Sequence, residues 1–378
     1  MNQKNFDIFL DFGASKLRVA AFDKKNVNNN HFIEYHCLSD INIKELDFSN
    51  SDEVIDKAIL DIEKKTGEYL DSINLMIDTP DVLSIGLSLS KKIEEKKINK
   101  KDIEYLIQDA KQQIFRSYPG KSIIHIILTN YKINEVDYNF LPTSIDCNRI
   151  SIDITFFSFP KKLIKNLEKL FQKHHILIKQ ILFSSYAKSL SYKEEIGSFK
   201  NIAFIDIGYK KTSIIYYKNG SFNFLHTMPI GSQNITKDIS KILKIDLEKA
   251  ELAKLNFDKD NNFLNDNKLS LDLIKKIIFA RVEEILEIST KFFKLNKDGE
   301  DLSHLKLILM GEGSKILDNK FKESISFTRD IDLLEETTLD ICESGLKLKQ
   351  GINKQEVVIV SKKLEKKGFF ERLFHFFK

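Results

Sequence analysis

The chain lacks tryptophan altogether and contains only three cysteines and five prolines. The cysteines, Cys37, Cys147 and Cys342, lie far apart without paired spacing. The sequence therefore predicts neither a disulfide framework nor a cysteine metal site, and it favours a reducing compartment. No apolar run reaches the ~18 residues of a membrane-spanning helix. The first residues lead into a predicted strand without an apolar signal segment.

The net charge is also small. The formal charge is only +4, so the composition provides no global attraction to nucleic acid, and we expect no nucleic acid partner. The chain does have 378 residues, of which 42% are hydrophobic and 30% charged. This composition is typical of a globular protein, and the length is sufficient for two domains that each bury a core.

Residues 202–215 contain an apolar run that ends at Asp206-x-Gly208 and is followed by a second run rich in β-branched and aromatic residues. Asn219-Gly220 comes next, which is a hairpin signal. The same layout occurs early in the chain, where Asp11-x-Gly13 separates two apolar runs between residues 6 and 22. Two such hairpins, a domain's length apart, indicate a duplicated architecture.

The remaining segments alternate strand and helix signals, as in a mixed α/β protein. Residues 83–159 have strands around a single amphipathic helix and form a predicted separate module. A long amphipathic helix is predicted at 271–293, and a strand at 305–310 ends in Gly311-Glu312-Gly313-Ser314. Residues 331–337 have a loop-like pattern, and residues 338–350 predict a last helix closed by Gly351.

The end of the chain has a different pattern. On a helix, its apolar residues occupy one side and the charged residues the other, and lysines lie immediately upstream. This pattern predicts a helix that binds an anionic membrane surface, with docking in a protein groove as the alternative. The predicted membrane-binding residues are Phe369, Phe370, Leu373, Phe374, Phe376 and Phe377.

The Asp-x-Gly turns are candidate phosphate sites because backbone N–H groups in such a turn point into one concavity, where a small residue lets phosphate approach. Two paired turns would hold a phosphate chain from both sides, with Asp11 and Asp206 positioning Mg²⁺ through water. The 311–314 turn would accept a flat base. Each turn taken alone is also compatible with an ordinary glycine hairpin.

The three turns together resemble the phosphate 1, phosphate 2 and adenosine motifs of the actin/Hsp70/sugar-kinase superfamily. Within that superfamily the chain resembles the FtsA family of bacterial cell division, over nearly its whole length. Segments 228–239, 246–251 and 278–285 are similar to FtsA segments, and the module at 83–159 lies where FtsA carries an extra subdomain. The amphipathic end after a linker is also typical of that family.

The resemblance implies an α/β, actin-like (ribonuclease H-like, duplicated) two-domain fold. It places subdomain IA at 1–82 and 160–200, the inserted α+β subdomain IC at 83–159, IIA at 201–232 and 300–351, and IIB at 233–299. A linker at 352–365 and the amphipathic helix at 366–378 follow. The nucleotide-binding residues that it implies are Asp11, Gly13, Ala14, Ser15, Lys16, Asp206, Gly208, Tyr209, Lys210, Thr212, Glu284, Gly311, Gly313 and Ser314.

The implied function is that of a membrane-tethered adaptor that binds ATP with Mg²⁺, self-associates, and recruits downstream division proteins. It would bind the C-terminal tail of the tubulin-like FtsZ, with Arg281 facing that tail, on the cytoplasmic side of the inner membrane at the septum. Two features depart from the family pattern: Tyr209 and Lys210 occupy a usually glycine-rich turn, and Glu312 replaces a glycine. We therefore expect weak or absent hydrolysis, and a protein that is not an enzyme.

Two rival functions stay open at this point. A phosphotransferase or phosphatase of the same superfold would need a catalytic carboxylate, and the sequence offers only Asp11 and Asp206. An adaptor similar to the pilus-assembly protein PilM would have the same fold without its own membrane helix.

Overall fold

The structure is a computed structural model of the chain. It describes residues 5–36, 51–93, 97–98, 100–138, 141–142, 145–197, 199–256, 269–295, 305–317, 321, 330–351 and 357–359. The predicted membrane-binding residues from Phe369 to Phe377 and most of the predicted linker lie outside the described residues. Among the described helices, none is long and apolar enough to cross a membrane.

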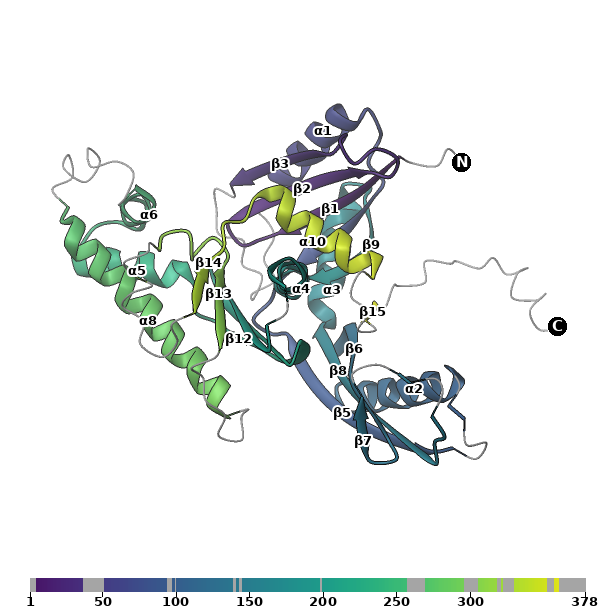
Figure 1. Ribbon diagram of the computed structural model, residues 1–378. Helices are drawn as coiled ribbons and strands as arrows, with labels where there is room; N and C mark the ends of the chain where they lie inside the picture. The colour runs from purple at the N-terminus through teal and green to yellow at the C-terminus, as the bar shows by residue number, and fades with distance from the viewer. Residues whose placement is uncertain are drawn as a thin grey trace.

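Two sheets of matching design form the two halves of the molecule (Figure 1). Each has an antiparallel hairpin whose first strand also pairs in parallel with a later strand, in the orders β3-β2-β1-β4-β9 and β12-β11-β10-β13-β14. The predicted duplication is therefore confirmed. The strands of the first sheet are β1 (Phe6–Phe12), β2 (Lys16–Asp23), β3 (His31–His36), β4 (Ser72–Ile77) and β9 (Leu177–Phe183). Those of the second are β10 (Asn201–Ile207), β11 (Thr212–Lys218), β12 (Ser221–Met228), β13 (Lys306–Met310) and β14 (Ile331–Leu333).

The first sheet lies between helices. Figure 1 shows α10 in front of this sheet and α1 behind it. The helices of this half are α1 (Asp52–Thr66), α3 (Lys161–Lys173), α4 (Ser184–Ile196) and α10 (Thr338–Gln350). Helix α10 has the predicted bounds. Thr337 caps its start through Asp340, and Gly351, in the left-handed conformation, ends it.

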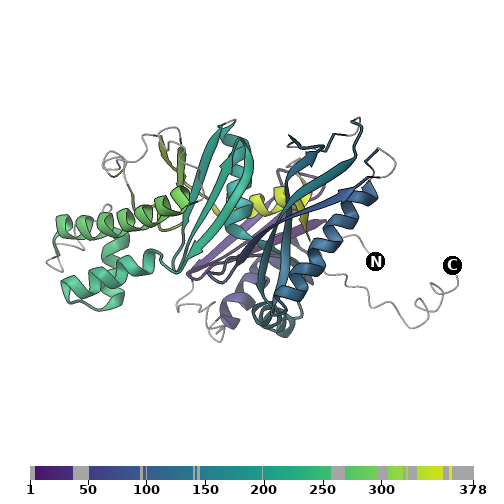
Figure 2. The ribbon, with the colours of Figure 1, turned by 90° about the horizontal axis from the view of Figure 1, so that it is seen from below.

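The second half carries α5 (Ser232–Leu243), α6 (Leu247–Asn256) and α8 (Leu271–Leu295) on the outer side of its sheet, at the opposite end of the molecule from the inserted module (Figures 1 and 2). Helix α8 matches the predicted long helix within two residues. Its apolar side contributes Ile274, Ile278, Val282 and Ile285 to the core of this half. The 331–337 segment, predicted as a loop, begins with β14, which pairs with β13.

The inserted module has its own sheet and its own core, as its pattern predicts. Helix α2 (Lys100–Ser117) packs against β5 (Leu83–Lys92) and β8 (Arg149–Pro160). The strands β6 (Lys121–Ile133) and β7 (Val136–Tyr138) belong to the same sheet. A short strand, β15 (Val357–Ile359), pairs with β6 at the edge of this sheet. The predicted linker at 352–365 therefore contains a strand, and the β-branched run from Val357 to Ile359 is a strand signal that the sequence interpretation missed among the surrounding polar residues.

Helix α4 is a helix that the sequence interpretation did not predict. Residues 184–192 are all buried, and the helix packs against α10 and against strands of both sheets. Because the helix is enclosed on all sides, its apolar and polar residues do not separate onto two faces, so no helical periodicity appears. The structure thus places a buried, serine-rich helix between the two halves.

Candidate functional site

A cavity of about 610 Å³ lies between the two halves, at the turns of the two hairpins. Both sheets contribute to its walls, together with the first residues of α4, the start of α5 and the loop before α10. The lining residues are Asp11, Phe12, Gly13, Ala14, Ser15, Lys16, Arg18, Asp78, Pro80, Ser184, Lys188, Asp206, Gly208, Tyr209, Lys210, Lys211, Pro229, Gln233, Asn234, Lys237, Gly311, Glu312, Glu336 and Ile341.

The two hairpin turns have the same backbone construction. The Gly13 N–H donates to the Lys16 carbonyl at 3.0 Å, and the Gly208 N–H donates to the Lys211 carbonyl at 2.9 Å. Each turn follows its aspartate by two residues, so that Asp11 and Asp206 lie at matching positions of the two sheets. Both aspartates are buried. The duplicated sequence pattern therefore becomes a duplicated site geometry.

The third turn packs directly onto the second hairpin. The Gly313 N–H donates to the Ile207 carbonyl at 2.8 Å, and the Gly311 N–H donates to the Glu336 carboxylate at 2.7 Å. Gly311 has φ +91°, and a Cβ there would meet the backbone of Ile207. Glycine at this position lets the third turn close against β10, which brings Glu312 to the cavity.

Asp11 is held inside the first half. The Arg18 guanidinium, its cross-strand neighbour, lies 2.9 Å from the carboxylate, and the Ser184 hydroxyl donates to it at 2.8 Å. Burial raises the pKa of Asp11, and the charge of Arg18 offsets that effect only in part. The Arg18 pKa is raised because the surrounding carboxylates outweigh the effect of its burial.

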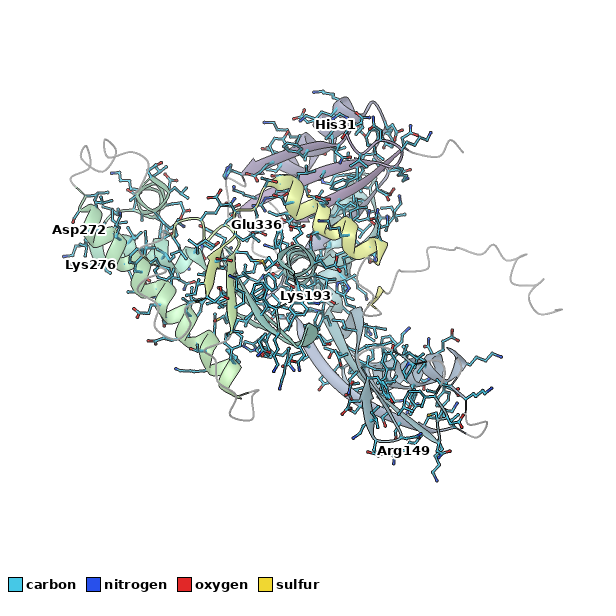
Figure 3. The ribbon with its side chains drawn as sticks, viewed as in Figure 1. His31, Arg149, Lys193, Asp272, Lys276 and Glu336 are labelled. Atoms are coloured by element: carbon cyan, nitrogen blue, oxygen red, sulfur yellow. The ribbon has the colours of Figure 1, made fainter. Side chains whose placement is uncertain are left out.

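Asp206 is paired with a cation from the other half. Lys188 Nζ on α4 lies 2.9 Å from the Asp206 carboxylate and 3.1 Å from that of Glu336. Figure 3 shows Glu336 where α10 begins, at the junction of the halves. Burial alone would raise the Asp206 pKa, but Lys188 and Lys211 lower it, whereas burial raises that of Glu336. The two carboxylates together raise the Lys188 pKa despite its burial.

A second set of charges crosses the cavity near its rim. Glu312 reaches from the second half to Arg18 Nη2 at 2.8 Å and to Lys16 Nζ at 3.0 Å. Glu34, on β3 of the first half, binds the same two cations at 3.0 and 2.9 Å. Burial alone would raise the pKa of Glu312, but the charges of Arg18 and of nearby lysines lower this pKa to about 2.

These ion pairs determine whether the site can hold a divalent cation. Mg²⁺ prefers carboxylate and water oxygens, yet Asp11 and Asp206 already bind Arg18 and Lys188. Among the described residues, no group of three or more His, Cys, Asp or Glu side chains is placed to hold a metal. The residues present do not fit a resident Mg²⁺, and the predicted role of the two aspartates in holding one stays a prediction without support from the geometry.

A nucleotide fits the residues better than a metal does. The cavity volume is in the range of ordinary ligand sites, and both glycine turns line it. Lys16, Lys210, Lys211 and Lys237 also line it and would attract phosphate. The cations next to the first turn, Lys16 and Arg18, however, already form ion pairs with Glu312.

The structure brings most of the predicted nucleotide residues to the cavity but leaves four outside its lining. Thr212 donates to the Ile230 carbonyl at 2.7 Å, and Ser314 donates to the Gly311 carbonyl at 2.8 Å, next to Gly313. Glu284 pairs with Arg281 on the surface of α8, and Arg281 also binds Asp238 at 2.6 Å. The role of Glu284 near the nucleotide, and that of Arg281 toward a peptide, stay predictions.

The Tyr209 side chain has a definite partner. Lys254 Nζ of α6 lies 5.6 Å from the centre of the Tyr209 ring, a cation–π arrangement, and Lys254 is also paired with Glu251 at 2.7 Å. The large Tyr209 side chain in the second turn therefore contacts α6. Tyr209 still lines the cavity.

The sequence interpretation missed the residues that set the charge of the site: Arg18, Lys188 and Glu336. Arg18 follows Lys16 by two residues on the same strand, so period-two alternation would have placed both on one face. Lys188 and Glu336 have no local signal, since one lies on an unpredicted helix and the other in a loop.

The architecture, two matching sheets with a cleft between them and an inserted module, is that of an actin-like protein, and this predicted fold is confirmed. The solved structure of a PilM–PilN type IV pilus biogenesis complex matches with a TM-score of 0.59 and 13% sequence identity, covering 89% of this chain and 89% of that one. At this identity, the likeness shows the fold alone.

Within that class, the sequence is similar to FtsA. Residues 203–285 match the family model of cell division protein FtsA. FtsA of Buchnera aphidicola subsp. Acyrthosiphon pisum is 24% identical over 384 residues, which is 89% of this chain and 91% of that protein. FtsA of Bacillus subtilis is 27% identical over 61% of this chain and 53% of its own length, and FtsA of Streptococcus pneumoniae is 23% identical over 68% and 57%. The predicted resemblance to FtsA is thereby confirmed.

Proposed function

We propose that this protein is an FtsA-like adaptor of bacterial cell division that connects FtsZ filaments to the cytoplasmic side of the inner membrane. The observation that carries the proposal is the similarity to FtsA over 89% of the chain, which spans both halves and the inserted module. In this proposal the protein self-associates, recruits downstream division proteins at the septum, and binds ATP in the cleft.

The cleft supports nucleotide binding rather than turnover. A bound ATP would supply a triphosphate that joins the two turns, with its phosphates near the first-turn backbone at Ala14 and Ser15 and near Lys16. General-base catalysis needs a carboxylate placed to accept a proton from water. Asp11 and Asp206 are each bound to a buried cation and a serine hydroxyl, so neither is placed for that role. We expect ATP hydrolysis to be slow or absent.

Membrane attachment is assigned to residues 366–378, on their sequence pattern alone. Flotation of the full chain with vesicles that contain anionic lipid tests this part, against a chain truncated after Lys363. The full chain should float and the truncated chain should remain in the dense fraction. Equal flotation of both would rule out the terminal helix as the anchor.

Binding of the FtsZ tail tests the adaptor role itself. A fluorescent FtsZ C-terminal peptide should bind the full chain with a Kd in the micromolar range, and Arg281→Ala should weaken the binding. Lys291→Ala, an exposed position on the same helix, is the matched control. Absence of binding at tens of micromolar would count against an FtsA-like role and favour a PilM-like adaptor. Rapid ATP turnover dependent on a small acceptor would instead favour a phosphotransferase.

A further inference from the structure

Glu312 is the anionic group that spans the rim of the cleft. It lies in the turn after β13 of the second half, and its two carboxylate oxygens separately meet Arg18 and Lys16 of the first half, at 2.8 and 3.0 Å. Lys315 of its own turn binds the same carboxylate at 2.7 Å. One carboxylate thus gathers three cations, as a phosphate group does at a basic site.

The Arg18 guanidinium shows why Glu312 differs from its neighbours. Its Nη1 binds Asp11, its Nε binds Glu34, and its Nη2 binds Glu312. Asp11 and Glu34 belong to the same sheet as Arg18, whereas Glu312 comes from the other half. Of these three contacts, the one to Glu312 is the contact that joins the two halves.

We propose that Glu312 is an internal substitute for a phosphate group: it occupies Lys16 and Arg18, holds the cleft closed without nucleotide, and is displaced by the phosphates of an incoming nucleotide. The cations that a phosphate would use at the first turn are the cations that Glu312 uses.

Burial indicates which cross-cleft contact is displaced. The Lys188 and Asp206 side chains are 7% and 5% exposed, and their ion pair lies deep between the halves. The Glu312 side chain is 26% exposed and lies at the rim, where solvent and ligands reach it. The deep pair therefore holds the halves together in either state, and the Glu312 contact is the part that opens.

Two consequences distinguish this device from an ordinary nucleotide cleft. The halves are held closed at the rim in the absence of nucleotide, and the affinity for nucleotide is reduced because its phosphates must compete with a tethered carboxylate. The first consequence is independent of the proposed function, and only the second rests on the proposed nucleotide site.

The test compares Glu312→Gln with Glu34→Gln in the full chain. Glu34 binds the same two cations at nearly the same distances but from the same half, so its variant removes an equal charge without releasing the cross-cleft contact. Hydrogen–deuterium exchange without nucleotide should show faster exchange at residues 13–18 and 311–317 in Glu312→Gln, with no acceleration at 311–317 in Glu34→Gln. Glu312→Asp, which keeps the charge, should restore part of the protection.

Titration with N-methylanthraniloyl-ATP provides the second measurement. Its Kd should fall about tenfold in Glu312→Gln relative to the wild type, because the phosphates no longer have to displace the Glu312 carboxylate from its cations. If exchange at 311–317 is the same in Glu312→Gln and wild type, Glu312 does not hold the cleft closed. If the Kd of Glu312→Gln is unchanged or higher, Glu312 does not compete with the nucleotide phosphates. If no variant binds the nucleotide at millimolar concentration, the proposed nucleotide site fails, while the exchange data still decide whether Glu312 closes the cleft.

Discussion

Lys188 of α4 and Asp206 of β10 form an ion pair of 2.9 Å that joins the two halves of the molecule. The same lysine binds Glu336, and Tyr192 from the next turn of α4 also donates to Glu336, at 3.1 Å. These groups are almost completely removed from water. Each charge therefore depends on its partners for compensation.

Replacement of Lys188 by methionine should destabilise the protein strongly. The variant keeps much of the side-chain volume but leaves Asp206 and Glu336 without their shared cation, which costs about 3–5 kcal/mol when a buried pair is broken. Urea unfolding followed by circular dichroism measures the loss. Lys193→Met on the same helix, where the lysine lies over the Tyr217 ring, is the control and should cost about 1 kcal/mol or less. Equal losses in the two variants would contradict the central role of Lys188.

Gly231→Ala should disturb the second turn. A Cβ at Gly231 would lie 2.5 Å from the Tyr209 carbonyl and 2.6 Å from the Gly208 carbonyl, and these carbonyls accept the Gln233 and Ser232 N–H groups at the start of α5. Since backbone atoms must move, we expect a loss of about 1–3 kcal/mol together with weaker nucleotide binding. Gly86→Ala, where a Cβ meets nothing within 4 Å, is the control. A Gly231→Ala protein as stable as that control would show that this approach is not restrictive.

His125 should make the stability depend on pH between about 6.5 and 3. Its Nε2 accepts the Phe183 N–H at 2.9 Å beside Tyr186 and Phe157, and burial lowers its pKa to about 3. The unfolded chain binds a proton in this range while the folded chain does not, so the free energy of unfolding falls as the pH falls.

Between pH 6.5 and 5 this loss amounts to about 2 kcal/mol in the wild type. His125→Gln, whose side-chain carbonyl accepts the same N–H, should lose correspondingly less over that interval. Urea unfolding at several pH values measures both proteins. Parallel pH profiles of the two would contradict a buried neutral histidine.

The stabilisation that Glu312 provides should decrease as the pH falls below its unfolded pKa. Its pKa is lowered to about 2 from an ordinary value of 4.5. The contribution is therefore fully present above about pH 4.5 and is lost as the pH falls toward 2. The Tm difference between wild type and Glu312→Gln should be largest near pH 6–7 and should shrink below pH 4.5. A difference that stays constant down to pH 3 would show that the carboxylate charge is not involved.

The two hairpins were predictable from sequence because a strand, a turn and the next strand are encoded by adjacent residues. The Asp11-x-Gly13 and Asp206-x-Gly208 turns form as their patterns predict, and α8 and α10 follow their periodicity and capping signals. Helix α4 was not predictable in this way, since burial on all sides removes the contrast between its faces.

The sequence by itself determined the duplicated α/β architecture, the three turns and the resemblance to FtsA, because these depend on local patterns. Only the tertiary structure decided the charge of the cleft. Arg18 and Glu312 are 294 residues apart, and Lys188 and Glu336 are 148 apart. No local pattern specifies such partners; they meet because the strand order brings the ends of two separate sheets together around one buried helix.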